Sequence, residues 1–145
     1  MIYIRSIIYT ALMFLSFLIL APIALLPRPI INNERRWQVA KTWATLNIFL
    51  SKKICGLTYK ISGLENSPKQ KCVVFAKHSS VYEIFILLRY FSPSSWVGKY
   101  ELMYLPIFRG VFKKFKLIPV KRGFGSSEVD RVKAEGKERL ESGNW

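Results

Sequence analysis

His78, the only histidine in the chain, stands between two apolar runs, residues 72–76 and 84–88, and Glu83 follows it by five residues. An imidazole titrates near neutral pH, and a histidine held by a carboxylate is typical of a general base with its orienting group. Five residues correspond to about 500° of rotation along an α-helix. His78 and Glu83 can therefore meet only if His78 lies in a loop and Glu83 in the first turn of the following helix.

The same residues also have a purely structural interpretation. Ser80 and Glu83 have the spacing of a capping box, in which the serine caps a helix and the glutamate reaches back to the first backbone amide. A histidine at the end of a strand can equally be an ordinary polar loop residue. The two interpretations are compatible, because a capping box would create the arrangement that brings His78 and Glu83 together.

Composition indicates a polyanionic partner. Lysine and arginine total 23 against 9 acidic residues, which gives a net charge of +14 over 145 residues. Nucleic acid and an anionic membrane surface both fit such a charge. Cys55 and Cys72 form no spacing motif and are expected to be reduced, buried thiols, which fits a cytosolic face. One histidine and two scattered cysteines argue against a zinc site.

The N-terminal segment favours the membrane over nucleic acid. Residues 7–26 carry no charge and are long enough to cross a bilayer core. The run ends in Pro27-Arg28-Pro29 instead of a small-residue cleavage site, so we expect a retained anchor over residues 1–30. More basic residues follow the run than precede it, and the positive-inside rule then places the rest of the chain in the cytosol. Pro22 leaves open a bent helix that enters one leaflet without spanning.

Residues 34–55 predict a second helix with apolar side chains nearly all round. Such a helix is buried in protein or lies in lipid. Trp37 and Trp43, close to several basic residues, suit a membrane interface, and an ordinary buried helix fits equally well. The segment 31–56 is therefore expected to be an interfacial or a buried helix.

The rest of the chain, residues 57–145, alternates predicted strands with predicted helices, which is the pattern of an α/β domain. The proline at position 119 hints at an edge or an end of the sheet. The expected strands cover residues 57–62, 71–76, 96–99 and 117–120. The expected helices cover residues 80–90, residues 101–115 with an interruption at Pro106, and a polar stretch from Ser127 to Leu140.

Taken in order, several of these segments resemble the glycerophospholipid acyltransferases, most of all the bacterial 1-acyl-sn-glycerol-3-phosphate acyltransferases. Residues 77–83, Lys-His-Ser-Ser-Val-Tyr-Glu, are similar to the family's first block, His-x4-Asp, and to its K-H-x-S-x-W-E form with Tyr82 for tryptophan. Residues 99–102 and 106–110 resemble the family's "K-x-E-L…I-P-x-F-G" segment. Residues 118–122, Ile-Pro-Val-Lys-Arg, resemble its second block, which ends in arginine.

The resemblance implies an acyltransferase-type mixed sheet with flanking helices, preceded by a membrane-associated helical pair. It implies transfer of a fatty acyl group from acyl-CoA or acyl carrier protein to the free hydroxyl of a lysophosphatidate at the inner, cytoplasmic membrane. His78 would be the base and Glu83 its orienting group. Arg122 matches the arginine that the family uses on the acceptor side, with Lys99 and Lys121 adding charge. No metal or organic cofactor is implied.

The family's third block, F-P-E-G-T-R, would begin a few residues beyond Trp145. The resemblance therefore implies an N-terminal part of the acyltransferase domain, with an incomplete sheet and little or no turnover. Two alternatives stay open: a non-catalytic acyltransferase fragment, and a membrane-anchored basic module that binds lipid or nucleic acid. Nucleic acid is not expected, because no nucleic-acid module signature occurs and the aromatic residues lie in apolar runs.

Overall fold

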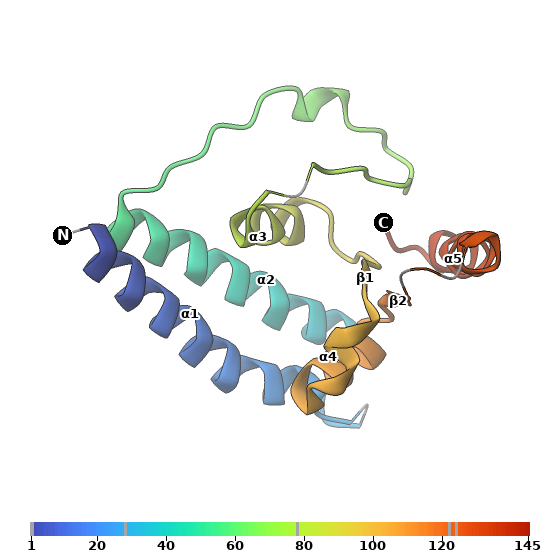
Figure 1. Cartoon of the computed structure of the whole chain (residues 1–145). Helices are drawn as coiled ribbons and strands as arrows, with labels where there is room; N and C mark the ends of the chain where they lie inside the picture. The colour runs from blue at the N-terminus through green and yellow to red at the C-terminus, as the bar shows by residue number, and fades with distance from the viewer. Residues whose placement is uncertain (1, 28, 78, 122, 124) are drawn as a thin grey trace. The chain divides into compact units, whose positions relative to one another are not determined.

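The computed structural model describes residues 2–27, 29–77, 79–121, 123 and 125–145 (Figure 1). The chain divides into two compact units, each described below by itself. The first comprises Met1–Gln70 and Ala76–Tyr90, and the second comprises Lys71–Phe75 and Phe91–Trp145. His78 and Arg122 lie outside the described residues.

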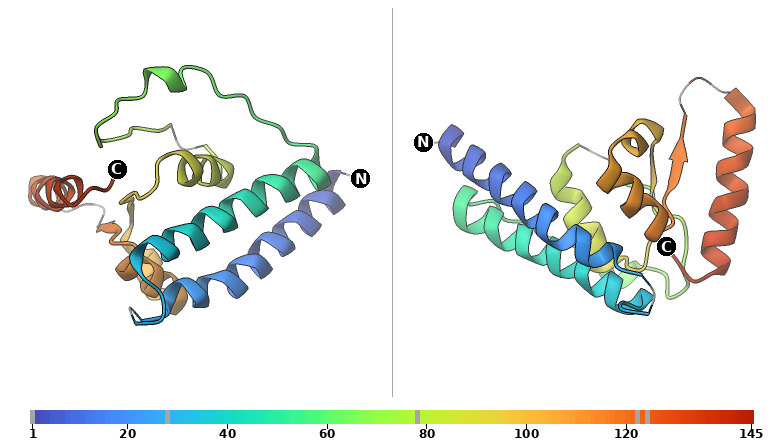
Figure 2. Two further views of the ribbon diagram at one scale, coloured as in Figure 1. Left: turned by 180° about the vertical axis from the view of Figure 1, so that it is seen from behind. Right: turned by 90° about the horizontal axis from the view of Figure 1, so that it is seen from below.

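The first unit is built on a helical hairpin. Helices α1 (Ile2–Leu25) and α2 (Asn33–Leu50) lie side by side along their lengths in both views of Figure 2. Asn32 caps α2 by accepting a 2.8 Å hydrogen bond from the Arg35 amide. Helix α2 continues as a single π-helical turn, η1 (Ser51–Cys55), and ends at Gly56 with φ of 71°. The helix predicted over residues 34–55 is thus confirmed.

Buried polar side chains fix how α1 and α2 pair. The guanidinium of Arg36 donates from Nε to the Ala24 carbonyl at 2.8 Å and from Nη2 to the Leu26 carbonyl at 3.2 Å, so it satisfies the C-terminal end of α1. Nearer the middle, Trp43 Nε1 and Asn47 Nδ2 both donate to Ser16 Oγ, at 3.2 and 3.4 Å. These bonds link particular residues of the two helices and therefore specify their register.

Helix α1 passes the length and composition test for a membrane span. Its most apolar 18-residue stretch has a mean hydropathy of 2.3, and 17% of that stretch is buried. Core helices of soluble proteins and signal sequences can be equally long and apolar. Helix α1 is the one candidate span within the described ranges. The helix continues past Pro22 to Leu25, so the predicted helix is confirmed and its membrane role stays a prediction.

Helix α3 (Val81–Tyr90) packs on α2 through a fully buried phenylalanine, Phe85. The Phe85 ring meets the Trp43 ring edge-on at 5.0 Å between centroids. Tyr82 joins the same cluster, with its ring 6.4 Å from that of Phe85. The aromatic face of α3 therefore holds the first turn of this helix, where Glu83 lies, against the hairpin. The helix predicted over residues 80–90 is confirmed.

Two predicted strands are wrong. Residues 57–62 and 71–76 are irregular backbone, and the short 3-10 helix η2 (Leu64–Asn66) lies between them. Strand propensity mostly reflects packing against neighbouring strands, and in the described part of the chain no strand pairs with either segment. The apolar side chains of the second segment are correspondingly exposed, with Phe75 at 95%.

The second unit contains a β-α-β crossover. Strands β1 (Val97–Lys99) and β2 (Ile118–Val120) pair in parallel, which confirms both predicted strands. Between them lie the 3-10 helix η3 (Tyr100–Tyr104) and helix α4 (Pro106–Lys114). Pro106 occupies the first position of α4, where its missing amide costs nothing, so the predicted interruption is a helix start. Gly98 lets α4 approach, since a Cβ there would lie 2.9 Å from Phe112 Cζ.

Helix α5 (Gly125–Glu141) follows β2 and begins two residues before the predicted start at Ser127. The architecture in the described residues is therefore helix-rich, with a two-stranded parallel sheet that is smaller than the expected mixed sheet. The thiols of Cys55 and Cys72 are both free, as expected, but each is partly exposed, so their predicted burial is wrong. Cys72 lies in irregular backbone, because the strand expected there does not form.

Candidate active site

The carboxylate of Glu83 reaches back from the first turn of α3 into the loop before it. Its oxygens accept hydrogen bonds from the Ser79 amide at 2.9 and 3.1 Å and from the Ser80 amide at 3.2 Å. The Ser79 hydroxyl donates to the same carboxylate at 2.6 Å. The reach-back half of the predicted capping box is confirmed, and it extends one residue further to Ser79. A negative charge is also favoured at the N-terminus of a helix.

This arrangement fixes the chain on the C-terminal side of His78. Residues 77, 79 and 80 are non-helical and Glu83 lies in the first turn of α3, which is the loop-then-helix arrangement that the sequence required. The Ser79 amide is the group that directly follows His78 in the chain. The carboxylate is therefore anchored one residue from the histidine, while the His78 ring lies outside the described residues.

The predicted acceptor-side cations gather at one edge of the second unit's sheet. Lys99 is the last residue of β1 and stands opposite Val120, the last residue of β2. Lys121 comes next in the chain and is exposed, as Lys99 is. Because β1 and β2 are parallel, their carboxyl ends meet at one edge, and ligands of such sheets bind outside the carboxyl ends. Arg122 follows Lys121 and lies outside the described residues.

Lys121 is held at two points, by Tyr100 and by Glu128, and the sequence alone indicated neither contact. Its ammonium lies 4.4 Å from the centroid of the Tyr100 ring, which is cation–π geometry. Its backbone amide donates to Glu128 Oε1 on α5 at 3.0 Å. Tyr100 directly follows Lys99, so both strand ends contribute to the environment of this lysine.

Glu128 is in turn held by Arg131 and is strongly acidic. The Arg131 guanidinium donates from Nη2 to Glu128 Oε1 at 2.5 Å and from Nε to Oε2 at 3.2 Å. The hydrogen bond from Arg131, with the one from the Lys121 amide, lowers the pKa of Glu128 to about 2. The same contact, with a second one from Glu135, raises the pKa of Arg131 above its ordinary value. Arg131 follows Glu128 at i,i+3 and precedes Glu135 at i,i+4, and both spacings predict ion pairs along a helix.

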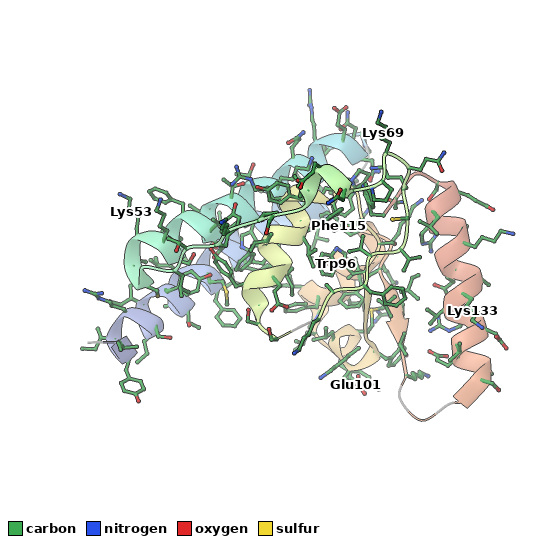
Figure 3. The ribbon with its side chains drawn as sticks, turned by 90° about the horizontal axis from the view of Figure 1, so that it is seen from above. Lys53, Lys69, Trp96, Glu101, Phe115 and Lys133 are labelled. Atoms are coloured by element: carbon green, nitrogen blue, oxygen red, sulfur yellow. The ribbon has the colours of Figure 1, made fainter. Side chains whose placement is uncertain are left out.

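The described site residues fall into two groups. In the first unit, Glu83 is brought together with Ser79 and Ser80. In the second unit, Lys99 and Lys121 are brought to one sheet edge, with Tyr100 and Glu128 beside Lys121. Other charges of α5 face solvent, such as Lys133, which Figure 3 labels and whose side chain is 73% exposed.

Residues 58–145 match the family model described as "Acyltransferase". The chain belongs to the acyltransferase family. It is 31% identical over 143 residues to a 1-acyl-sn-glycerol-3-phosphate acyltransferase of Pseudomonas aeruginosa, which covers 98% of this chain and 56% of that protein. It is 30% identical over 97 residues to "1-acyl-sn-glycerol-3-phosphate acyltransferase LPAT1, chloroplastic" of Arabidopsis thaliana, which covers 66% of this chain and 26% of that protein.

The chain thus spans about half the length of the bacterial relative and less of the plant one. No solved structure matches it. The family resemblance drawn from the order of the blocks is confirmed.

Proposed function

We propose that this acyltransferase moves a fatty acyl group from an acyl thioester to the free hydroxyl of 1-acyl-glycerol-3-phosphate and so makes phosphatidic acid. The names of the two relatives support this reaction. The structural observation that carries the proposal is the Glu83 carboxylate bonded to the amide that directly follows the chain's only histidine.

In the proposed reaction His78 is the general base. An alcohol is a poor nucleophile at neutral pH, and a base within hydrogen-bond reach contributes about 10²–10⁴-fold. His78 takes the hydroxyl proton while the oxygen attacks the thioester carbonyl carbon. The carbon–sulfur bond then breaks, and the proton passes from the imidazolium to the departing thiolate. The products are an ester and a thiol, so atoms and charge balance.

Glu83 would orient the imidazole and stabilise its charged form, as the acidic member of a triad does. Three backbone or hydroxyl donors already fix its carboxylate, so it needs no rearrangement as charge develops. Acyl-CoA or acyl carrier protein is the donor in this proposal. The steps use no metal or organic cofactor, since a positioned base and a thioester leaving group are sufficient.

The acceptor phosphate is proposed to bind at the C-terminal ends of β1 and β2. Arg122 would bind it, because a guanidinium can make two parallel bonds to phosphate oxygens. Lys99 and Lys121 would add charge from the two strand ends. The ordinary alternative for any one of these residues is a solvated surface cation.

The lipid substrates favour a location at the cytoplasmic membrane, with residues 57–145 on the cytosolic side. The exposed apolar side chains of α1 would contact lipid, and residues 1–30 would form the anchor. The exposed lysines at the C-terminal end of α4 and just after it would meet anionic headgroups, at about 1 kcal/mol each near the surface. These lysines are Lys113, Lys114 and Lys116.

A second candidate is a non-catalytic, lipid-binding member of the same family. The capping contacts of Glu83 favour it, because they account for the position of this carboxylate without any chemistry. The two candidates differ in whether the protein forms phosphatidic acid from an acyl thioester and lysophosphatidate at all.

The deciding experiment measures acyl transfer from radiolabelled acyl-CoA and acyl carrier protein to lysophosphatidate in membranes. One sample holds residues 1–145, and a second extends them with the remaining part of the Pseudomonas relative. We expect phosphatidic acid from the extended version and little from residues 1–145, which span 56% of that relative. Product in neither sample, with both proteins folded and membrane-bound, would reject the proposed reaction. Equal turnover by both would show that residues 1–145 hold the whole catalytic apparatus.

A further inference from the structure

One edge of β2 is bonded to side chains of α5. In an extended strand, residues i and i+2 present their backbone groups to the same edge. The Ile118 amide bonds to the Trp96 carbonyl, so position 118 faces β1 and its neighbours face the opposite edge. On that opposite edge Arg131 Nη2 donates to the Pro119 carbonyl, and the Lys121 amide donates to Glu128. The Glu128–Arg131 pair therefore bonds two successive groups of the outer edge, as a third strand would.

This pair is well suited to hold the backbone in place. Arg131 grips Glu128 with two nitrogens and reaches Glu135 Oε1 with a third, at 2.5 Å. The Glu128 side chain is only 17% exposed. Since Arg131 keeps the Glu128 carboxylate ionised down to strongly acidic pH, the bond from the Lys121 amide is charge-assisted at any working pH.

Exposed ion pairs on a helix usually contribute little, which is the ordinary interpretation of such a pair. Asp130 and Lys133 form a pair of that kind, at 3.7 Å with both side chains more than 70% exposed. Glu128 differs because its carboxylate also accepts a hydrogen bond from the backbone amide of Lys121, directly after β2. The residue it bonds, Lys121, immediately precedes the proposed phosphate-binding arginine.

We propose that Glu128, fixed by Arg131, is a positioning residue for the acceptor phosphate: it holds the backbone of Lys121, the residue directly before Arg122 in the chain. The proposal rests on the acceptor site of the proposed function. With the Lys121 amide released, the backbone at this position samples more orientations while the fold stays intact. The cations are then less well placed before the phosphate binds, and affinity is lost through reduced preorganisation.

The test measures binding, so it does not depend on turnover. A short-chain lysophosphatidate and the monoacylglycerol of equal chain length, which lacks the phosphate, are titrated into residues 1–145 by calorimetry in neutral detergent. We expect Glu128→Gln to weaken lysophosphatidate binding by about threefold to tenfold, because the neutral amide loses its charge-assisted bonds to Arg131 and to the Lys121 amide and keeps at most weaker neutral ones. Binding of monoacylglycerol should stay the same. Glu128→Asp, which keeps the charge on a shorter side chain, should restore part of the loss.

Glu135→Gln is the matched control, because Glu135 also pairs with Arg131 whereas the hydrogen bond from the Lys121 amide goes to Glu128. We expect its lysophosphatidate affinity to stay within twofold of the unaltered chain. Equal effects of Glu128→Gln and Glu135→Gln, with Lys121→Ala weakening the phosphate probe, would overturn the role of Glu128 and leave the acceptor site standing. If the unaltered chain binds both probes equally, the acceptor site fails and this inference with it. Should Glu128→Gln fail to fold, Glu128→Asp against Glu135→Asp carries the same comparison.

Discussion

The Glu83 carboxylate lies 2.9 Å from the backbone nitrogen of Ser79, the residue that follows the chain's only histidine. That contact serves both interpretations of this segment. It closes a helix cap, and it also fixes a carboxylate beside the residue that the proposed reaction uses as a base. The two roles separate under mutation, because a cap needs an acceptor atom whereas an orienting group needs a negative charge.

Replacement of His78 by alanine should reduce acyl transfer by roughly 10²–10⁴-fold, the contribution of a positioned general base. The measurement is turnover of the version extended to the full length of the Pseudomonas relative. Calorimetric binding of lysophosphatidate serves as the control and should change little, because the base acts on the hydroxyl and not on the phosphate. Near-normal turnover by His78→Ala would show that His78 is not the base of this reaction.

Substitutions of Glu83 should separate activity from stability. Aspartate keeps the charge, so Glu83→Asp should retain more acyl transfer than Glu83→Gln. For thermal unfolding we expect the reverse order, since glutamine has the length to accept from the Ser79 and Ser80 amides and aspartate is one methylene shorter. Full activity of Glu83→Gln would leave Glu83 with the capping role alone.

Local patterns predicted the elements whose signals come from the chain itself. The apolar run of α1 and the capping signature before α3 act through neighbouring residues, whereas Pro106, predicted to interrupt a helix, begins α4. The strands at 57–62 and 71–76 were predicted wrongly, because the side chains that favour strands need a partner strand to pack against. Phe75, 95% exposed, shows the consequence of that missing partner.

The candidate site was predictable to the same extent. The sequence indicated Glu83, Lys99 and Lys121, and the parallel pairing of β1 and β2 brings the two lysines to one edge. It gave no sign that Glu128 bonds the Lys121 amide, because a contact from a side chain to a distant backbone group depends on how α5 packs on β2. The spacing of Glu128 and Arg131 showed only that the two could pair along one helix.

Removal of the proposed phosphate ligand should affect one substrate more than the other. Arg122→Ala is expected to raise the KM for lysophosphatidate by at least about tenfold, as loss of a charge-assisted pair does, and to leave the KM for the acyl donor nearly unchanged. Lys133→Ala, at a solvent-exposed position on α5, is the control and should change neither value by more than about twofold. A parallel rise in both KM values for Arg122→Ala would exclude a specific role in acceptor binding.

The stability that Glu128 contributes should depend on pH in a defined window. Its pKa is about 2 in the folded protein against an ordinary value of 4.5, so folding favours the ionised form. A lowered folded pKa means that the contribution is complete above pH 4.5 and disappears as pH falls through 2. The difference in Tm between the unaltered chain and Glu128→Gln should therefore be constant from pH 5 to 8 and shrink below pH 4.5. A difference that grows on acidification would contradict the assigned pKa.

Two phenylalanines provide a matched test of what holds the first turn of α3 in place. Phe85 is fully buried against Trp43, and Phe75 is 95% exposed. Phe85→Ala should lower the free energy of unfolding by about 3–5 kcal/mol, because it removes a large buried side chain and leaves a cavity. Phe75→Ala should change it by less than about 0.5 kcal/mol, as an exposed substitution does.

Urea titration in detergent, followed by tryptophan fluorescence, measures the free energy of unfolding of both variants. Because Trp43 contacts the Phe85 ring, its fluorescence also reports on this site. Equal effects of the two substitutions would mean that α3 is held by something other than its aromatic face.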